Sequence, residues 1–369
     1  MISPLYRKLA EIAVKYSIKV REGQRVIIRG SNVAQELALA IYIEVLKAGA
    51  HPFISLNIEG EKEALLKYGS DEQITYIDKV ILDAFEEFDG LISIRSSYNT
   101  HSFGAFDQER VSKMVGSENQ RKIYTTTQER ELAGEFEWVV IPFPCEAYAQ
   151  EANMDILTYS EFVQKALFTD KEDPIGEWQK INKKQEKIAE YLNKKEEIHV
   201  LGEDTDLTLS VKGRKWINCS GQRNLPDGEI FTSPVEDAVN GKIRFTYPGI
   251  YSGQEVENIY LEFKDGIVTR AEAAKNQKLL EHIIRVDGAN KLGEFAVGTN
   301  YGITQFTKNI LFDEKLGGTI HSALGFGPKE TGSQNESSIH WDILKDMTIE
   351  GSKILADGEI IYKEGEWKI

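Results

Sequence analysis

Two residues near the end of the chain have the types and spacing of metal ligands. His340 and Asp342 lie two positions apart in SSIHWDIL, where apolar residues alternate with them. In a β-strand this alternation directs the imidazole and the carboxylate to the same face. A solvent-facing polar edge is the commoner explanation for an isolated H-x-D pair. The metal interpretation therefore requires further donors elsewhere in the sequence.

Three other polar residues occupy unusual positions in the second half of the chain. Glu229 follows the turn sequence of NLPDGEIFTSP, Glu294 stands before the apolar run of LGEFAVGTN, and His321 lies inside the glycine-flanked GGTIHSALG. Each residue alone has a simpler explanation: an exposed strand residue, a strand edge, and a core histidine with its own hydrogen-bond partners. A buried carboxylate at position 294, however, needs a cation, because an unpaired buried charge is too costly.

The five residues together make a mixed set of two imidazoles and three carboxylates. Nitrogen and oxygen donors of this kind suit Zn²⁺, Co²⁺ or Mn²⁺, and one carboxylate can bridge two ions. Two ions about 3.5–4 Å apart can activate a water molecule and polarise a scissile carbonyl. The sequence by itself does not show that the five side chains converge in space.

The elements that must position these residues change in character along the chain. In the first half, predicted strands at 25–29, 52–57, 90–95, 122–127 and 138–143 alternate with predicted helices at 32–48, 71–87 and 106–115. This order predicts an α/β domain with a mostly parallel sheet. A charged helical connector is expected at 176–197. From 198 onward, short alternating runs predict a β-rich α+β domain whose one strong helix covers about 276–286.

We therefore expect an α/β domain over 1–175, the connector, and a β-rich catalytic, metal-binding domain over 198–369. The 369 residues are enough for two such cores. A net charge of −15 argues against nucleic-acid binding, which depends on cationic groups. No apolar run reaches the length of a membrane helix, and the two cysteines make no disulfide framework. The expected location is the cytoplasm.

Four separated motifs indicate, through a resemblance to a known family, that the five side chains meet in space. NLPDGEIFTSP, LGEFAVGTN, IHSALG and the ETG…NESSIHWD block occur in an order that resembles the aminopeptidase T and aminopeptidase S family of dinuclear metallopeptidases. The resemblance covers essentially the whole chain. It places Glu229, Glu294, His321, His340 and Asp342 on metal-ligand positions, with Glu294 as the bridge. It also implies two divalent ions (Zn, Co or Mn/Mg), peptide substrates with a free N-terminus, and a homodimer.

Two positions depart from the pattern of that family. A family glutamate shortly before the first ligand histidine has its nearest counterpart here in Glu314, two residues further upstream, which is either a general base or a surface charge. Many members also carry a tyrosine seven positions after that histidine, where its hydroxyl would stabilise an oxyanion. This chain has Pro328 there, which offers no donor. Tyr247, Tyr251 and Tyr301 are candidate replacements.

The leading hypothesis is a metal-dependent aminopeptidase that uses a water molecule activated by two ions. Its main rival is a catalytically weak or inactive member that retains the site for metal or peptide binding, as the proline at 328 suggests. A third possibility is a metal-dependent hydrolase of another small amide. The requirement for a free α-amine distinguishes the first hypothesis from the third.

Overall fold

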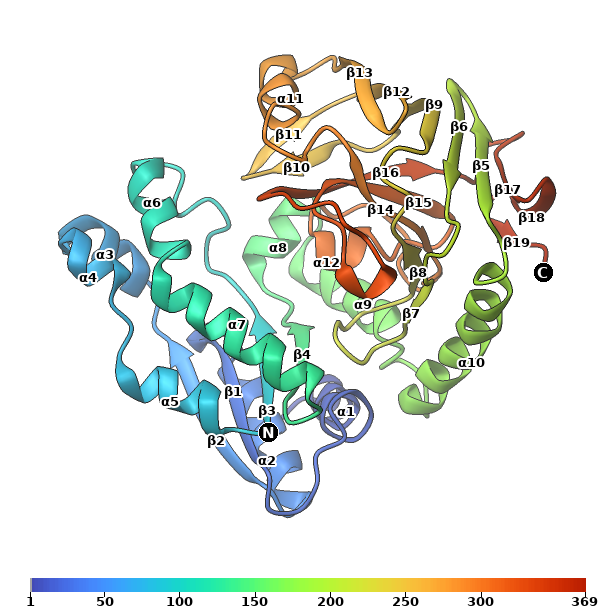
Figure 1. Cartoon of the computed structure of the whole chain (residues 1–369). Helices are drawn as coiled ribbons and strands as arrows, with labels where there is room; N and C mark the ends of the chain where they lie inside the picture. The colour runs from blue at the N-terminus through green and yellow to red at the C-terminus, as the bar shows by residue number, and fades with distance from the viewer. Residues whose placement is uncertain (1) are drawn as a thin grey trace. The chain divides into compact units, whose positions relative to one another are not determined.

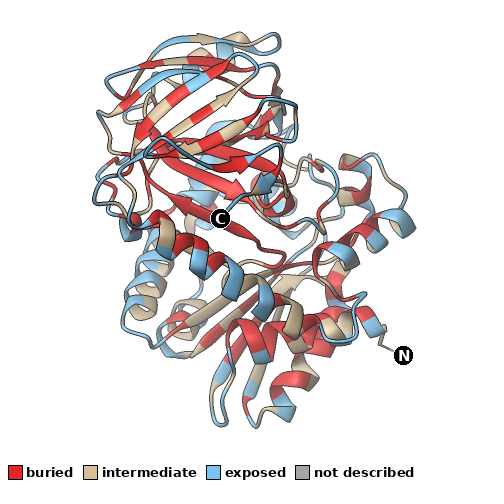
Figure 2. Ribbon diagram, turned by 90° about the vertical axis from the view of Figure 1, so that its right-hand side faces the viewer, coloured by how far each residue is buried: buried red, intermediate tan, exposed pale blue. Residues whose placement is uncertain are grey.

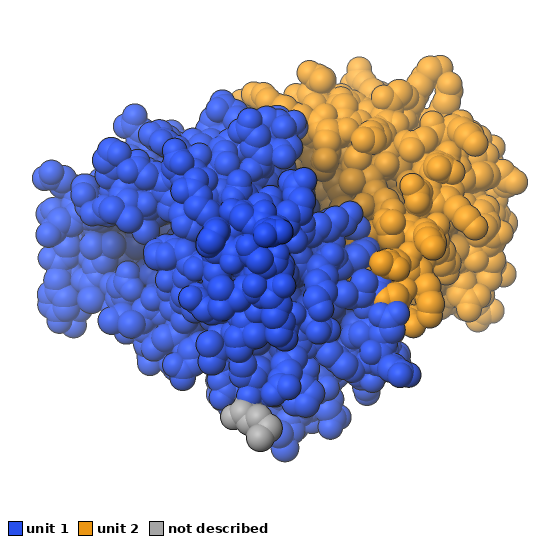
Figure 3. All heavy atoms as spheres, turned by 90° about the horizontal axis from the view of Figure 1, so that it is seen from below, with its two compact units in different colours: residues 1–175, 221–225 blue, residues 176–220, 226–369 orange. Residues whose placement is uncertain are grey.

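The structure is a computed structural model that describes residues 2–369, and these fall into two compact units (Figures 1 and 3). Unit 1 comprises Met1–Ile175 and the short segment Gly221–Leu225. Unit 2 comprises Gly176–Ser220 and Pro226–Ile369. An α/β unit followed by a β-rich unit is the fold class predicted from the sequence, which is therefore confirmed.

Unit 1 is built on a parallel four-stranded sheet with the order β2-β1-β3-β4. Its strands are β1 (Arg25–Ser31), β2 (His51–Asn57), β3 (Gly90–Arg95) and β4 (Glu137–Pro142). On one face, Ile27 packs with Phe85 of α5 (Lys79–Glu87) and with Ile123 of α7 (Glu118–Leu132). The helices α1 (Pro4–Glu11) and α2 (Gln35–Lys47) lie on the other face (Figure 1). Helices on both faces are the usual cover of a parallel sheet.

Two predicted elements of this unit are wrong. The predicted strand at 122–127 lies inside the helix α7, because Ser117 caps the N-terminus of that helix through Gln120 N and the flanking residues favour helix. The local run of β-branched threonines gave the false strand signal. The predicted helix at 71–87 is divided into α4 (Asp71–Thr75) and α5, since Asp78 caps a new helix.

The remaining helical elements of unit 1 are short. They are η1 (Ile12–Ser17), η2 (Asn32–Ala34), α3 (Glu61–Tyr68), α6 (Gln108–Val115), α8 (Glu146–Glu151) and α9 (Ile156–Ala166).

Unit 2 contains two antiparallel sheets and a hairpin, after the long helix α10 (Pro174–Leu192). The larger sheet has the order β13-β12-β9-β6-β5-β17-β18-β19. Its strands are β5 (Glu197–Gly202), β6 (Thr205–Ser210), β9 (Val239–Arg244), β12 (Tyr260–Lys264), β13 (Ile267–Glu272), β17 (Lys353–Ala356), β18 (Glu359–Lys363) and β19 (Glu366–Trp367). The hairpin pairs β10 (Gly249–Tyr251) with β11 (Gln254–Val256). The helical segments that follow are α11 (Gln277–Ile283), α12 (Ile310–Asp313) and η3 (Lys329–Thr331).

The smaller sheet of unit 2 has the order β16-β15-β14-β8-β7. Its strands are β7 (Ile217–Cys219), β8 (Glu229–Thr232), β14 (Leu292–Gly298), β15 (Thr319–Gly325) and β16 (His340–Asp346). One face of it carries Phe295, Ile320 and Ile343, which join the core shared with the larger sheet and with Leu192 of α10. Every residue of β14 and β15 is buried, and Figure 2 shows buried residues, in red, along many strands of the structure. The opposite face carries polar residues such as His321 beside the apolar Phe231 and Leu344.

No helix among residues 2–369 combines the length and the hydropathy that crossing a bilayer requires.

The core of unit 2 predicts a contrast between two isoleucines on adjacent strands. Ile354 of β17 is 1% exposed and Ile360 of β18 is 44% exposed. Ile354→Ala should lower the free energy of unfolding by about 2–5 kcal/mol, because it removes a buried side chain and leaves a cavity. Ile360→Ala, the matched control, should change it by less than about 0.5 kcal/mol. Urea unfolding measures both, and equal losses would contradict the assigned core.

Candidate metal centre

The strand register places the five predicted donors on one face of the smaller sheet. Directly paired residues in antiparallel strands point to the same side. Asp342 pairs with Ala323, His340 pairs with Gly325, and both partners share a face with His321 on β15. Ala323 also pairs with Glu294 of β14. Glu229 of β8 pairs with Gly298, four residues further along the same face. Two of the donors thus lie opposite small residues, Ala323 and Gly325.

A first group of donors surrounds the His321 ring. His321 Nε2 lies 3.4 Å from Glu229 Oε2 and 3.3 Å from Glu294 Oε1. All three residues are buried, and their donor atoms lie within 4.8 Å of one another. A second group surrounds the His340 ring, whose Nε2 lies 3.8 Å from Glu294 Oε2 and 3.5 Å from Asp342 Oδ1. Glu294 thus presents one oxygen to each histidine, which is the geometry of a bridging carboxylate.

The spacing of these atoms fits metal ions. Two ligands at about 2.1 Å from one tetrahedral ion lie about 3.4 Å apart. Three of the four measured separations, between 3.3 and 3.5 Å, are close to that value. Glu229 Oε2 and Asp342 Oδ1 are buried without a hydrogen-bond partner, although each is directed at a ring nitrogen. Buried polar atoms without a partner are costly unless a ligand satisfies them. The residues therefore fit two divalent ions that share Glu294.

Two glycines allow the backbone to present the two glutamates. Gly228 has φ +120°, and a Cβ there would lie 2.8 Å from the Cβ of Asn300. This places Glu229 at the start of β8 directly after a turn that only glycine adopts easily. Gly293 lies in a β-bulge of β14, where a Cβ would meet the backbone oxygens of Gly325 and Phe326. Bulges of this kind redirect a side chain toward a site, here that of Glu294.

Hydrogen bonds outside the donor set hold two of the donors. Gln185 of α10 is buried and donates from Nε2 to the backbone oxygen of Glu229 at 2.7 Å. His340 Nδ1 lies 2.8 Å from the backbone oxygen of Phe326. If Nδ1 carries the proton of this bond, Nε2 is left free as the ligand atom, which is the usual arrangement of a metal-binding histidine.

The carboxylates of the donor set shift the pKa of both histidines upward. Burial alone would lower the pKa of His321, but Glu294, Glu229 and Asp342 outweigh it and raise this pKa to about 9. The pKa of His340 is raised to about 10, because Asp342 and Glu294 outweigh burial in the same way. Despite burial, His340 and the other nearby cations hold the pKa of Asp342 at about 2. Surroundings that raise the pKa of two imidazoles favour positive charge.

Glu314 lies beside this set. It follows the short helix α12, and one of its carboxylate oxygens lies within 4.8 Å of donor atoms of His321 and Asp342. Its Oε1 accepts a hydrogen bond from Lys315.

Sequence reasoning missed Lys315, which lies next to the donor set. Its side chain is 1% exposed, and its Nζ donates to Glu229 Oε1 at 2.6 Å as well as to Glu314. Burial alone would lower the pKa of Lys315, but the carboxylates of Glu229 and Glu314 hold it above its usual value. The adjacent Glu-Lys pair gave no sequence signal of burial, because such pairs are common on protein surfaces.

Two further residues near Glu229 were also not predicted. Cys219 of β7 and Asp227 of the turn each offer an atom within 4.8 Å of the Glu229 carboxylate. Burial, followed by the charges of Asp227 and Glu229, raises the pKa of the Cys219 thiol well above its usual value. A thiol is a weaker metal ligand than a thiolate.

Pro328, which stands where many family members have a tyrosine, precedes the short helical turn η3. Its carbonyl oxygen accepts hydrogen bonds from Thr331 N and Oγ1, at 3.1 and 2.6 Å. Among the candidate replacements, Tyr301 donates its hydroxyl to the backbone oxygen of Gly365 at 2.7 Å. Tyr247 stacks on Phe306, and Tyr251 packs edge-on against Trp341, which lies between two donors in sequence. Trp341 belongs to the apolar face of this sheet, so its contact places the Tyr251 ring on the face opposite the donors.

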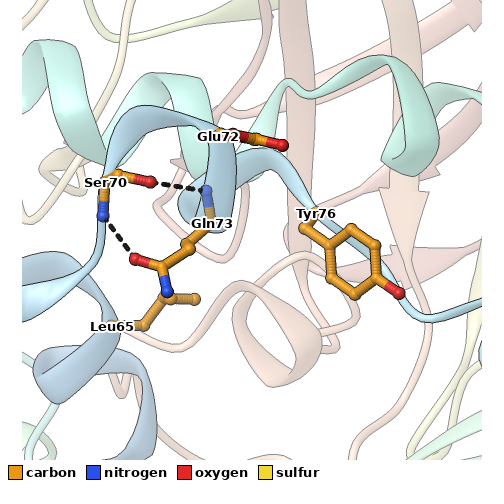
Figure 4. A pocket seen from close by; sticks show the side chains of 5 residues that line it. All are labelled: Leu65, Ser70, Glu72, Gln73 and Tyr76. Carbon is orange, nitrogen blue, oxygen red and sulfur yellow. Dashed lines mark hydrogen bonds between the residues drawn. The ribbon is translucent and has the colours of Figure 1, made fainter.

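A pocket in unit 1 offers a poorer site for catalysis (Figure 4). It is lined by Leu65, Ser70, Glu72, Gln73 and Tyr76. Ser70 and Gln73 use their polar atoms in a reciprocal capping box at the start of α4, which Figure 4 shows as two dashed lines. Only Glu72 and Tyr76 remain as titratable groups in this pocket.

The shared position of Glu294 predicts how each substitution changes metal content. Glu294→Ala should lower the affinity for both ions, since it removes a donor from each group. His340→Ala should lower the affinity for one ion only, by at least about 100-fold. Asp346→Asn is the matched control. Asp346 lies on β16 like His340, but its carboxylate accepts hydrogen bonds from Thr348 and belongs to neither donor group. Equilibrium dialysis followed by metal analysis gives the content, and circular dichroism reports folding. Two tightly held ions in Glu294→Ala would contradict the bridge.

The whole chain is similar to known proteins. Aminopeptidase 2 of Geobacillus stearothermophilus is 27% identical over 98% of this chain and 97% of its own length. Aminopeptidase T of Thermus aquaticus is 25% identical over 98% of both chains. The solved structure of wild-type AmpT from Thermus thermophilus covers 99% of both chains with a TM-score of 0.86 and 22% identity.

A more distant solved structure, a 2,5-dihydroxypyridine dioxygenase from Pseudomonas putida KT2440, has a TM-score of 0.59 at 13% identity, over 100% of this chain and 98% of its own. That likeness concerns the fold alone. The family model described as thermophilic metalloprotease (M29) matches residues 3–367. The chain therefore belongs to the M29 family of thermophilic metalloproteases.

Proposed function

We propose that this protein is a metal-dependent aminopeptidase that releases N-terminal residues from peptides. The observation that carries the proposal is the pair of donor groups that share Glu294, one around His321 and one around His340. Membership of the M29 family and the aminopeptidase names of its relatives support the same activity.

Five residues would hold the two metal ions, and a sixth would transfer protons. Glu229, Glu294 and His321 would hold one ion, and Glu294, His340 and Asp342 the other. When bound, two divalent ions lower the pKa of a water molecule and polarise the scissile carbonyl. Glu314 would take the proton of that water at Oε2, because Oε1 is paired with Lys315. The same carboxyl group would then return the proton to the leaving amine.

The donor set restricts the metal but does not single one out. Two imidazoles with carboxylates suit Zn²⁺, Co²⁺ and Mn²⁺ better than Mg²⁺, which prefers oxygen ligands. By family resemblance, we also propose a homodimer, a cytoplasmic location, and peptides with a free N-terminus as substrates. Light scattering at micromolar concentration tests the dimer.

A second candidate function is a catalytically weak member that binds metal and peptides. Pro328 is the observation that favours it, because a proline has no hydrogen-bond donor where many members have a tyrosine hydroxyl. Loss of one oxyanion donor typically lowers turnover by about 10²–10³-fold.

An aminoacyl-anilide assay tests the leading proposal. The purified protein should release the chromophore from leucyl- or alanyl-anilide in the presence of Zn²⁺ or Co²⁺, and lose this activity after chelation. N-acetylated anilides are the matched control and should not be cleaved, because the free α-amine is the mark of an aminopeptidase substrate. Equal cleavage of blocked and free substrates would instead indicate a hydrolase of other amides. No cleavage with two ions bound would favour the weak member.

Substitution at position 328 separates chemistry from binding. If the oxyanion donor is missing, Pro328→Tyr should raise kcat with little change in KM, because such a donor acts in the transition state. Pro328→Phe is the control that adds the ring without the hydroxyl. If wild-type turnover already reaches about 10 per second, an ordinary enzyme value, another group supplies the donor. Tyr251→Phe, Tyr247→Phe and Tyr301→Phe, made one at a time, would then identify it by a loss of kcat.

A further inference from the structure

Lys315 is a fully buried ammonium group that contacts the candidate metal centre directly. Four carboxylates gather there, from Glu229, Glu294, Glu314 and Asp342. Within residues 2–369, Lys315 is the only lysine or arginine that forms an ion pair with any of them. The other cationic partners are the two histidines that the ions would use as ligands.

The two oxygens of Glu229 have different partners. Oε1 accepts from Lys315 Nζ at 2.6 Å, whereas Oε2 has no hydrogen bond and is directed at His321 Nε2. One oxygen is therefore taken by the ammonium group, and the other is left for an ion. The same Nζ also pairs with Glu314, so it reduces the repulsion between two buried carboxylates.

We infer that Lys315 is the built-in counter-ion of the metal centre, which stabilises the gathered carboxylates before any ion binds and limits Glu229 to one metal-ligating oxygen. The inference rests on the metal centre of the proposed function but not on peptidase activity. Lys315 itself lies outside the four motifs that carry the family resemblance.

Removing the charge should make the protein depend more strongly on metal. In Lys315→Met, the metal-free chain keeps four buried carboxylates without their ammonium partner, so its Tm should fall. Added Zn²⁺ compensates part of the missing charge, so the metal-induced rise in Tm should exceed that of the wild type. The first ion should also bind about tenfold more tightly in calorimetry of the metal-free protein.

Lys345→Met is the matched control. Lys345 is also fully buried in unit 2, but its Nζ donates only to the backbone oxygens of Glu203 and Arg244, at 3.2 and 3.0 Å. Its replacement should lower the Tm equally with and without Zn²⁺. A metal-induced rise in Lys315→Met that is equal to or smaller than the wild-type rise would overturn the inference.

A double variant covers the case in which metal-free Lys315→Met does not fold. Lys315→Met with Glu314→Gln removes one positive and one negative charge together, so the protein should fold without metal and show a metal-induced rise near the wild-type value. If this double variant responds to Zn²⁺ as strongly as Lys315→Met does, or if it folds no better without metal, the counter-ion role is wrong.

A second inference concerns two arginines of unit 1. Arg29 of β1 pairs in register with Ser93 of β3, and Arg95 lies two residues further along β3, so both arginines share one face of the sheet. Neither forms an ion pair with a carboxylate within residues 2–369, whereas Arg25 of the same strand pairs with Glu87 at 3.0 Å. Burial and then the charge of Arg95 lower the pKa of the half-buried Arg29.

These arginines lie where open α/β sheets bind ligands. The strand β1 lies between β2 and β3, so the connection that leaves β1 and the one that enters β3 run to opposite sides of it. In open α/β sheets, ligands usually bind in the crevice at the carboxyl ends of the strands at such a point. Ser31 Oγ and Ser96 Oγ, just past the two arginines, are 3.4 Å apart and add hydroxyl donors at this edge. An anion would relieve the repulsion and accept from both guanidinium groups.

We propose that this edge of unit 1 binds an oxyanion, a carboxylate or a phosphate group. Calorimetry with inorganic phosphate tests binding of a phosphate group, and calorimetry with succinate tests binding of a carboxylate. At least one of them should bind, and Arg29→Met or Arg95→Met should weaken that binding at least tenfold. Arg25→Met, which removes a paired arginine from the same strand, should leave it unchanged. Binding of neither anion, or binding that survives both substitutions, would overturn the proposal.

Discussion

The gathering of buried negative charge on one face of a β-sheet is the constraint on which unit 2 depends. Four carboxylates lie within a few ångströms of two imidazoles, and most of these groups are screened from solvent. Such a cluster is stable only with cations, because an uncompensated buried charge is too costly. Lys315 supplies a cation that is not a candidate ligand, and the donor geometry is suited to two metal ions from solution.

The rest of unit 2 holds this cluster in place. The opposite face of the same sheet is packed with apolar side chains such as Phe295 and Ile343, so the strands cannot shift without disturbing the core. The bulge at Gly293 and the turn at Gly228 direct the two glutamates toward the histidines. Gln185 fixes the backbone at Glu229. Precise placement of ligands by a rigid scaffold is what a two-ion centre requires.

The candidate donors could be selected from the sequence, but their convergence was expected only from the resemblance to the aminopeptidase T and aminopeptidase S family. Glu229, Glu294, His321, His340 and Asp342 lie in motifs whose residue types suit metal ligands, and the structure brings them together. The fold class also followed from the order of strand and helix signals. The helix α7 was missed because its threonine-rich centre has strand propensity, which its cap and flanking residues override. Lys315 was missed because burial of a charged side chain is a tertiary property with no local signature.

Fold alone does not decide the chemistry, since the solved structure of a dioxygenase has a similar fold at 13% identity. The central claim is that two ions share Glu294. Crystals of the protein grown with Zn²⁺ and measured at the zinc absorption edge would test it most directly. Two anomalous peaks about 3.5–4 Å apart, one beside His321 and one beside His340 with the Glu294 carboxylate between them, are expected. A single peak, or no peak within reach of Glu294, would contradict the two-ion centre.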